Sequence, residues 1–392
     1  MDEELHNRVT AFRREIHQYP EIGFEEFETR KRIKKILMEF GIEETQMKEY
    51  EPTALCVYIH GKGAPSGNPK CVGLRADMDA LPMVEKNEHL EYRSKVEGKA
   101  HMCGHDGHMA CLVGFVPLVL KRLEQIPSDR TIKLLFQPSE EGPGSGAKKM
   151  VEDGCLDDVD EVYGFHQLGL SHYGELSVIP GPMLAEKTDL SIWIYGTGGH
   201  GGFPELTKFS TAAGVRFYQK ALGYFEELKK EHKEKFACSL PLFQAGEKNN
   251  VISETCFIAG TLRCIVEGLT EQVIGKLREL LEELATEGFT YKFEHPMIYP
   301  MVINHPKETE HVRRVGRKFF GEQKVTEKHL PLPGSEDFSY FLQHRPGAYF
   351  FLTSSEDQTI KMAHDCNYNF YDGLIPLASE FWLELALDRL GE

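Results

Sequence analysis

Residues 101–110 read HMCGHDGHMA, and the apolar stretch CLVGFVPLVL follows directly at 111–120. Thiolate, imidazole and carboxylate groups are the ligands that borderline-soft divalent metals prefer, and Cys103, His105 and Asp106 supply one of each. The apolar stretch predicts a mostly buried helix. The polar residues then lie in a loop or at a helix N-terminus, where free N–H groups favour anionic ligands. The alternative is a polar loop with incidental histidines.

Length and charge limit the classes of protein to consider. A chain of 392 residues is too long for one ordinary core, so we expect two domains. A composition of 41% hydrophobic and 27% charged residues is typical of a globular protein. The formal net charge of −16 argues against a nucleic-acid or anionic-membrane partner.

The same sequence indicates a compartment. We find no run of 18 apolar residues, and the N-terminus is charged from its second residue, so neither a membrane span nor a secretory signal is expected. Nine cysteines are scattered without a framework spacing, which favours free thiols in a reducing cytoplasm.

Predicted strands alternate with predicted helices through most of the chain. This alternation predicts an α/β fold with a mostly parallel sheet. The helices are expected at 5–16, 33–40, 112–123, 312–320 and 377–390, and the strands at 55–59, 71–76, 132–136, 161–164 and 348–352.

Metal-type side chains follow several of these strands. Asp77 and Asp79, then Glu140 and Glu141, and then His166 each fall at or just past a predicted strand end. Ligands of open α/β sheets bind at the carboxyl edge of the strands, so these segments should direct their side chains into one crevice.

Residues 186–296 have a different order of predicted strands and helices. The pattern there is β-α-β-β-α-β, which predicts a small ferredoxin-like domain inserted into the first. We therefore expect a catalytic domain formed by 1–185 and 297–392 and a lid or dimerisation domain at 186–296. The pattern places strands at 190–195, 240–244, 257–265 and 290–294 and helices at 211–229 and 269–287.

Two metal ions need about five to seven protein ligands, with positions left for water and substrate. The adjacent carboxylates Glu140 and Glu141 cannot easily share a role, so one would be a ligand and the other a general base. A solvated surface pair is the alternative interpretation. The candidate ligands are Cys103, His105, Glu141, His166 and His364.

Other polar residues allow both a functional and a structural interpretation. Asp79 could be a ligand, could orient a ligand imidazole, or could simply close a strand-end turn. His200 lies among glycines and could meet a developing oxyanion. Arg263 could clamp a carboxylate or form a surface ion pair, and Asn250 could contact substrate or belong to a turn.

At these residues the chain resembles the amidohydrolase branch of the dinuclear-metal aminoacylase and carboxypeptidase clan. That branch includes N-acyl-amino-acid amidohydrolases, hippurate hydrolases, N-acetyl-diaminopimelate deacetylases and indoleacetyl-amino-acid hydrolases. The resemblance runs nearly end to end and rests on R-x-x-H-Q-Y-P-E-I-G-F-E-E, R-A-D-M-D-A-L-P, H-M-C-G-H-D-G-H, F-Q-P-S-E-E-G, G-F-H, G-G-H-G-G-F-P, N-V-I, G-T-L-R and G-S-E-D-F-S-Y-F.

The resemblance implies a role for each candidate. Glu140 would be the catalytic base and Asp79 would orient the site. His200, Asn250 and Arg263 match lid positions that contact substrate, and in the family the histidine often comes from the other subunit of a dimer. The implied metal ligands are Cys103, His105, Glu141, His166 and His364.

The chain departs from the family pattern at three places. Glu205 stands where the family usually has His, Cys366 where it usually has Pro, and Gln167-Leu168-Gly169 where Gly-x-His usually runs on to Pro. These departures bear on substrate preference and leave every expected ligand in place.

We therefore expect a metal-dependent amidohydrolase that cleaves N-acyl amino acids. It should hold two divalent metal ions per subunit, zinc or manganese, with cobalt or nickel as alternatives. We expect a cytoplasmic homodimer or dimer of dimers. The alternatives are a dipeptidase or carboxypeptidase on the same scaffold, and a silent binding protein, which the loss of Glu140 or of a ligand would mark.

Overall fold

The computed structural model describes residues 1–169, 173–353 and 361–391, which form two compact units. Unit 1 consists of Met1–Gly181, Ile303–Leu330 and Asp337–Glu392, and unit 2 of Pro182–Val302 and Pro331–Glu336. The range 186–296, expected to form an inserted domain, lies inside unit 2.

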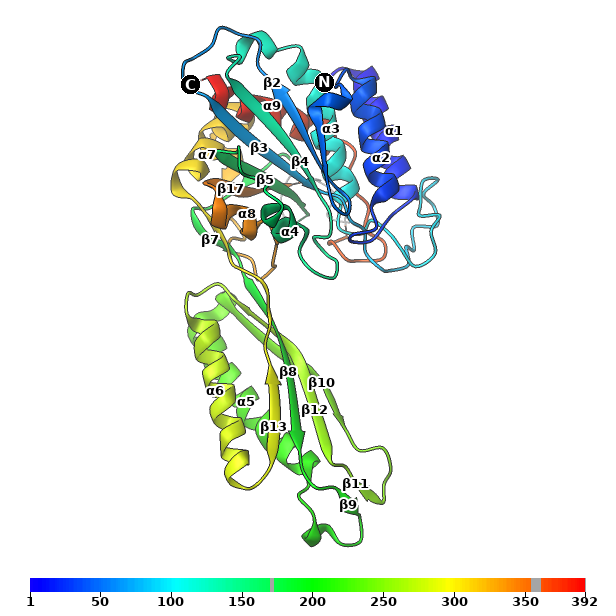
Figure 1. Cartoon of the computed structure of the whole chain (residues 1–392), viewed down its shortest axis with the longest axis vertical. Coiled ribbons are helices and arrows are strands. Elements are labelled where there is room, and N and C mark those ends of the chain that lie inside the picture. The colour runs from blue at the N-terminus through cyan, green and yellow to red at the C-terminus, as the bar shows by residue number, and fades with distance from the viewer. Residues whose placement is uncertain (170–172, 354–360, 392) are drawn as a thin grey trace. The chain divides into compact units, whose positions relative to one another are not determined.

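A mostly parallel sheet forms the centre of unit 1 (Figure 1), with the strand order β1-β2-β4-β3-β5-β17-β6-β16. Strands β4, β3, β5 and β17 run parallel to one another, as predicted. Strand β2 is antiparallel to both β1 and β4, and β6 is antiparallel to β17. The bounds are β1 (Met47–Tyr50), β2 (Ala54–His60), β3 (Lys70–Asp77), β4 (Arg130–Gln137), β5 (Glu161–Leu168), β6 (Leu176–Ser177), β16 (Val325–Thr326) and β17 (Gly347–Thr353).

The strand order reverses at β3. The chain passes from β3 through α3 to β4 on one side, and then through α4 to β5 on the other side of β3. Because parallel crossovers are right-handed, the two helices must cover opposite faces of the sheet. Such a reversal opens a crevice at the carboxyl ends of the strands, where α/β proteins bind ligands.

The helices of unit 1 pack on this sheet and on one another. Helix α3 contacts α1, α9 and β3, and is apolar and buried nearly all round, which explains its uninterrupted apolar sequence. Helix α1 is amphipathic and begins at Glu3, after the N-cap residue Asp2, whose side chain accepts a hydrogen bond from the N–H of Leu5. The bounds are α1 (Glu3–Gln18), α2 (Phe27–Glu39), α3 (His105–Leu120), α4 (Gly146–Glu152), α7 (Pro306–Phe320), α8 (Ser339–His344) and α9 (Leu374–Gly391).

Unit 2 contains an antiparallel sheet of order β10-β12-β8-β13, to which β14 adds beside β8. Helices α5 and α6 bury their apolar sides on this sheet around one core. The connectivity is the predicted β-α-β-β-α-β. The bounds are β8 (Glu186–Tyr195), β9 (Gly199–His200), α5 (Ser210–His232), β10 (Phe236–Ala245), β11 (Val251–Ile252), β12 (Thr255–Cys264), α6 (Leu269–Thr286), β13 (Thr290–Glu294) and β14 (Met297–Tyr299).

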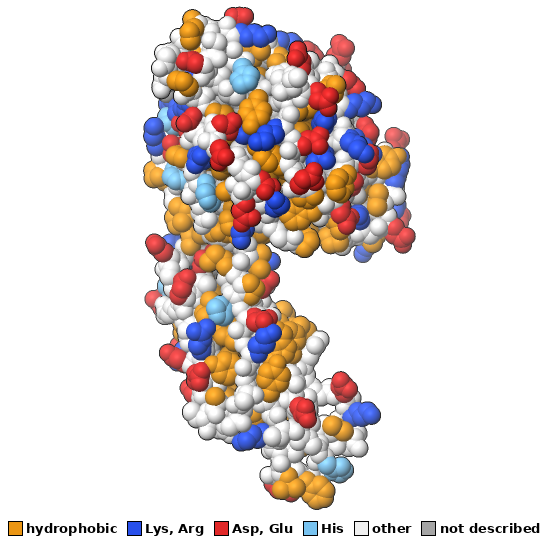
Figure 2. All heavy atoms as spheres, viewed as in Figure 1, with side chains coloured by type: hydrophobic (Ala, Val, Ile, Leu, Met, Phe, Trp, Pro, Cys, Tyr) orange, Lys and Arg blue, Asp and Glu red, His pale blue; other side chains and the backbone are white. Residues whose placement is uncertain are grey.

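The short strands β7 (Gly181–Leu184) and β15 (Val302–Asn304) lie where the chain passes from one unit to the other. Figure 2 shows acidic and basic side chains interspersed over the visible face of unit 1, as on a solvated surface. Among the described residues, no helix is both long enough and apolar enough to cross a bilayer.

Candidate active site

Segments at or just past the carboxyl ends of β3, β4 and β5 carry several of the candidate residues. Asp77 ends β3, and Glu140 follows β4 after two residues. His166 lies inside β5, not past its end, because pairing with β17 continues to Leu168 and Thr353. The order of these strands around the β3 reversal brings the turns together, as the sequence predicted.

The loop before α3 depends on a glycine. Gly104 has φ +95°, and a Cβ atom there would lie 2.5 Å from the hydroxyl oxygen of Tyr368. A residue with a side chain would be both strained and obstructed at this position. The turn at Gly104 starts the helix at His105 and leaves Cys103 just before it.

The five candidate ligands form one cluster. Sγ of Cys103 lies 3.3 Å from Nε2 of His166. Nε2 of His364 lies 2.5 Å from Oε1 of Glu141. Ligand atoms of Cys103, Glu141 and His364 lie within 4.8 Å of one another, and so do those of Cys103, His105 and His166. These distances suit donors that share metal ions.

The imidazole of His105 is held from one side only. Its Nδ1 lies 2.9 Å from the backbone oxygen and 3.2 Å from Oδ1 of Asp79. Its Nε2 is buried and has no hydrogen-bond partner among the described residues. Burying a ring nitrogen without a hydrogen-bond partner costs free energy of folding, and a metal ion bound to that nitrogen would remove the cost.

The electrostatics of the cluster are compatible with bound cations. Burial, Glu141 and Glu140 raise the pKa of the Cys103 thiol well above its usual range. Burial, with His108 adding to it, lowers the pKa of His166 to about 3, so this imidazole is neutral and free to act as a ligand. The donor set therefore fits divalent metal ions, which take neutral imidazole and stabilise thiolate.

Glu140 lies beside this cluster and is buried, with a relative exposure of 6%. Its Oε2 is 4.0 Å from Nε2 of His105. The next residue, Glu141, is held separately, because its backbone N–H donates to Oδ2 of Asp79 at 2.8 Å. Asp79 thus contacts both the His105 ring and the turn that carries the paired glutamates.

The structure adds a residue that the sequence analysis did not single out. The N–H of Gln167 donates to Nε2 of His108 at 3.1 Å, so Nδ1 of His108 carries the proton and donates to Oδ1 of Asp77 at 2.7 Å. The ring of His108 also packs edge-on against His166 at 4.4 Å. His108 therefore supports the strand that bears His166, and Asp77 supports His108.

A second buried network surrounds Asp106, in the first turn of α3. Arg13 and His17 donate to Oδ2 of Asp106 at 2.9 and 2.8 Å, and all three side chains are buried. Arg13 and His17 occupy successive turns of the face of α1 that includes Val9. Charged residues on the apolar face of an amphipathic helix were the sequence signal for this network.

Unit 2 holds the remaining candidates. His200 and Val251 pair between β9 and β11, and the N–H of Gly201 donates to the backbone oxygen of Asn250 at 2.8 Å. His200 and Asn250 are therefore neighbours on an exposed loop pair. Arg263 lies elsewhere, where its guanidinium donates to Oγ of Ser335 at 2.9 Å.

The register of β8 and β12 separates Arg263 from His200. Arg263 is opposite Lys187, and the strands run on to Tyr195, after which the chain reaches β9. The eight steps from Lys187 to Tyr195 correspond to about 27 Å at roughly 3.4 Å per residue. Arg263 therefore lies at one end of the β8–β12 pair, and β9, which bears His200, lies beyond the other end, as the labels of β8, β9 and β12 in Figure 1 show.

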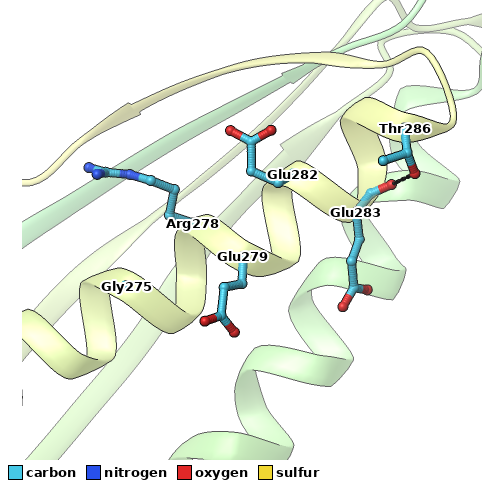
Figure 3. Close-up of a pocket in the computed structure, with 6 residues that line it drawn as sticks. All are labelled: Gly275, Arg278, Glu279, Glu282, Glu283 and Thr286. Carbon is cyan, nitrogen blue, oxygen red and sulfur yellow. Dashed lines mark hydrogen bonds between the residues drawn. The ribbon is translucent and has the colours of Figure 1, made fainter.

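A surface hollow of about 570 Å³ on helix α6 has a different character. Figure 3 shows the residues that line it. Its charged side chains bond neighbours on the same surface: Glu279 with Lys276, Glu283 with Lys220, and Glu282 with Tyr291. This hollow is a solvated helix face.

Comparison with known proteins identifies the family. A model of peptidase family M20/M25/M40 matches residues 73–388. The chain is 34% identical to thermostable carboxypeptidase 1 of Saccharolobus solfataricus, covering 91% of this chain and 88% of that protein. It is 33% identical to hippurate hydrolase of Campylobacter jejuni, covering 99% and 98%.

A solved structure has a similar fold. A dinuclear metal-binding peptidase of the M20 family from Bacillus subtilis superposes with a TM-score of 0.83 at 26% identity, covering all of this chain and 99% of that one. The family match spans most of the chain and includes the turns that carry the clustered donors. The chain belongs to peptidase family M20/M25/M40.

Proposed function

We propose that this enzyme hydrolyses the amide bond of N-acyl amino acids and releases a carboxylic acid and a free amino acid. The observation that carries the proposal is the donor cluster around Cys103 with the buried Glu140 beside it. The similarity to a hippurate hydrolase over nearly the whole chain supports the substrate class.

Two divalent metal ions would be held by Cys103, His105, Glu141, His166 and His364. Zinc or manganese suits this mixture of thiolate, imidazole and carboxylate, with cobalt or nickel as alternatives. When bound, the metals supply Lewis-acid polarisation of the amide carbonyl and lower the pKa of water. The similarity to a dinuclear metal-binding peptidase supports the count of two.

Glu140 would act as the base. It takes a proton from the attacking water and later returns it to the leaving amine. Its burial and its position 4.0 Å from His105 support this role, because a carboxylate there is shielded from bulk water. Asp79 would hold His105 and the backbone of Glu141 in place.

Arg263 would clamp the α-carboxylate of the substrate, because its planar guanidinium can bind a carboxylate through two hydrogen bonds. Asn250 would contact the substrate, and His200 would donate to the oxyanion of the tetrahedral intermediate. Arg263 lies about 27 Å from the His200 end of the sheet, at roughly 3.4 Å per residue. One copy of unit 2 cannot present both residues to one small substrate.

His200 would therefore act in trans, from the neighbouring subunit of a homodimer or a dimer of dimers. The exposed apolar side chains near His200 support the proposal that another subunit covers this surface. Phe203 packs near its ring, and Phe203 and Leu206 are 55% and 77% exposed. Exposed apolar side chains grouped on a loop are typical of interaction sites.

The cytoplasm is the compartment that fits the thiols. All nine cysteines are unpaired, and most are buried. Free thiols of this number persist in a reducing environment.

A carboxypeptidase is the second candidate, because similarity to a thermostable carboxypeptidase favours it. Both activities need recognition of the α-carboxylate, but a carboxypeptidase also accepts a peptide in place of the acyl group. Comparing turnover of an N-acyl amino acid, the corresponding unblocked dipeptide and the acyl amino acid α-amide separates the two. Preference for the dipeptide would refute the amidohydrolase assignment.

The carboxylate clamp is tested with the same substrates. Arg263→Lys should lower kcat/KM for acyl amino acids by about 10-fold or more and leave their α-amides nearly unchanged, because the amides lack the charge. Arg216→Lys, an exposed arginine paired with Glu287, is the matched control. An equal loss on acids and amides would point to a structural arginine.

A further inference from the structure

The N-terminal motif R-x-x-H-Q-Y-P-E-I-G-F-E-E, residues 14–26, has no role in the function proposed so far. In the structure this segment contacts three of the segments that carry candidate site residues. His17 bonds Asp106 beside His105. The backbone oxygen of Glu21 accepts from the N–H of Ala80, next to Asp79.

The third contact is made by Glu26, which is completely buried. Its Oε1 accepts from the backbone N–H of Ser139 at 2.9 Å, and its Oε2 lies 2.6 Å from the hydroxyl of Thr53. Ser139 immediately precedes Glu140. Burial, with Asp79 adding to it, raises the pKa of Glu26 to about 7. In either protonation state Oε1 remains an acceptor for Ser139.

The turn that Glu26 holds is a strained one. Ser139 has φ +48°, a conformation that non-glycine residues adopt only when their surroundings impose it. Its backbone oxygen accepts from the N–H of Gly146 at 3.0 Å, and the N–H of Glu141 donates to Asp79. The backbone is thus anchored on both sides of Glu140, and Glu26 provides the anchor on the strand side.

A close approach of two glycines completes the contact. A Cβ atom at Gly23 would lie 2.4 Å from Oγ of Ser139 and 3.0 Å from Cα of Gly142. A Cβ at Gly142 would meet the same Oγ at 2.5 Å. Residues 14–26 therefore pack directly against the turn at residues 139–142, and a single methyl group at position 23 would displace Ser139.

We propose that Glu26 is a positioning residue for Glu140, and that residues 14–26 brace the segments of the site that they contact. The role rests on the proposed function, in which Glu140 is the base. Without the Glu26 acceptor, the N–H of Ser139 is buried without a partner and the turn relaxes. The base then moves relative to the water it activates, while Asp79 still holds Glu141.

This arrangement predicts a loss in kcat without a matching change in KM. A misplacement of about 1 Å in a catalytic group can cost on the order of 100-fold in rate. We expect Glu26→Ala to lower kcat about 10- to 100-fold. KM should stay within about 3-fold, because Arg263 and not Glu140 holds the substrate.

The conservative variant separates positioning from charge. In Glu26→Gln the amide oxygen can still accept from Ser139 and the amide nitrogen can donate to Thr53. Glu26→Gln should therefore retain kcat within about 3-fold of the wild type, a rescue that a role for the negative charge would not give. Glu25→Ala is the matched control, since Glu25 is exposed and only pairs with Lys99.

The experiment measures kcat and KM for the metal-loaded enzyme with an N-acetyl amino acid, and amide hydrogen exchange of the 137–142 peptide. Exchange at Ser139 should be faster in Glu26→Ala than in the wild type, Glu26→Gln or Glu25→Ala. Exchange needs no turnover, so an inactive wild type would refute the proposed function without touching this readout.

Gly23→Ala gives a second route if Glu26→Ala fails to fold. It should also lower kcat and leave KM nearly unchanged, because it displaces Ser139 and leaves Glu26 intact. Unchanged kcat and unchanged exchange in both Glu26→Ala and Gly23→Ala would overturn the proposal. Equal losses in Glu26→Ala and Glu26→Gln would also overturn it, since the acceptor geometry would then be irrelevant.

Discussion

A test for action in trans combines two inactive subunits. One carries Glu140→Gln and the other His200→Ala, and each alone should form an inactive enzyme. The design follows from the register of unit 2, which places Arg263 about 27 Å from the His200 end of the sheet, at roughly 3.4 Å per residue. A substrate clamped by Arg263 must therefore receive His200 from another copy.

The expected recovery follows from counting sites. Random mixing of equal amounts makes about half of the dimers mixed. In a mixed dimer, one site has an intact Glu140 of its own and an intact His200 from its neighbour, and the other site has both lesions. About a quarter of all sites should therefore recover full activity. If His200 acts in cis, every site carries one lesion and no activity returns.

The assay is hydrolysis of an N-acyl amino acid after co-refolding subunits with two different affinity tags. Purification on both tags in succession isolates the mixed dimers, in which about half of the sites should be active. Native mass spectrometry verifies their composition. An inactive preparation of verified mixed dimers would refute action in trans, and a monomeric wild type would refute the dimer on which the design depends.

The remaining predictions concern the metal centre and the core. Glu140→Gln should lower kcat by about 100-fold or more while the metal content of the purified protein stays at the wild-type level; loss of metal would mean that Glu140 is a ligand. Cys103→Ala should release about one proton fewer per subunit on metal binding, measured by calorimetry in two buffers, because the raised pKa of the free thiol requires its proton to leave. Glu161→Gln should lower the free energy of unfolding in urea by about 3 kcal/mol at pH 7, because it breaks a buried pair with Arg389. Burial raises the pKa of Glu161, but the hydrogen bond to Arg389 outweighs it, and the pKa in the folded state is lowered to about 2. The stabilisation is therefore present above about pH 4.5 and fades as the pH falls toward 2. If the unfolding free energies of variant and wild type differ by the same amount at pH 7 and at pH 3, this linkage is wrong.

Most of the secondary structure could be predicted because it follows from local periodicity. The apolar run after His108 became the buried helix α3, and the alternation of strands and helices became a mostly parallel sheet. Strand β13 was expected at 290–294 and spans Thr290–Glu294. The reversed direction of β2 was not predicted, because a strand of seven residues looks the same whichever way it pairs.

The candidate ligands could be located because their residue types are those that bind metals and because several of them follow predicted strand ends. Glu141 follows the end of β4, whereas Cys103 and His105 lie just before and at the start of α3, and the three side chains come together in one cluster. His364 was a candidate ligand by residue type, and the resemblance strengthened that interpretation; its φ of +72° and its contact with Glu141 depend on a loop far along the chain.

What the sequence by itself determined was the set of donor groups and the order of the elements that carry them. Only the tertiary structure decided which residues support those groups. Glu26 and Ser139 are 113 positions apart, and His17 and Asp106 are 89 apart. No local pattern links such pairs, because a hydrogen bond between distant segments exists only after the sheet and helices have packed. The sequence therefore specified the reactive groups through local chemistry, and the packing of the whole unit decided how firmly each is held.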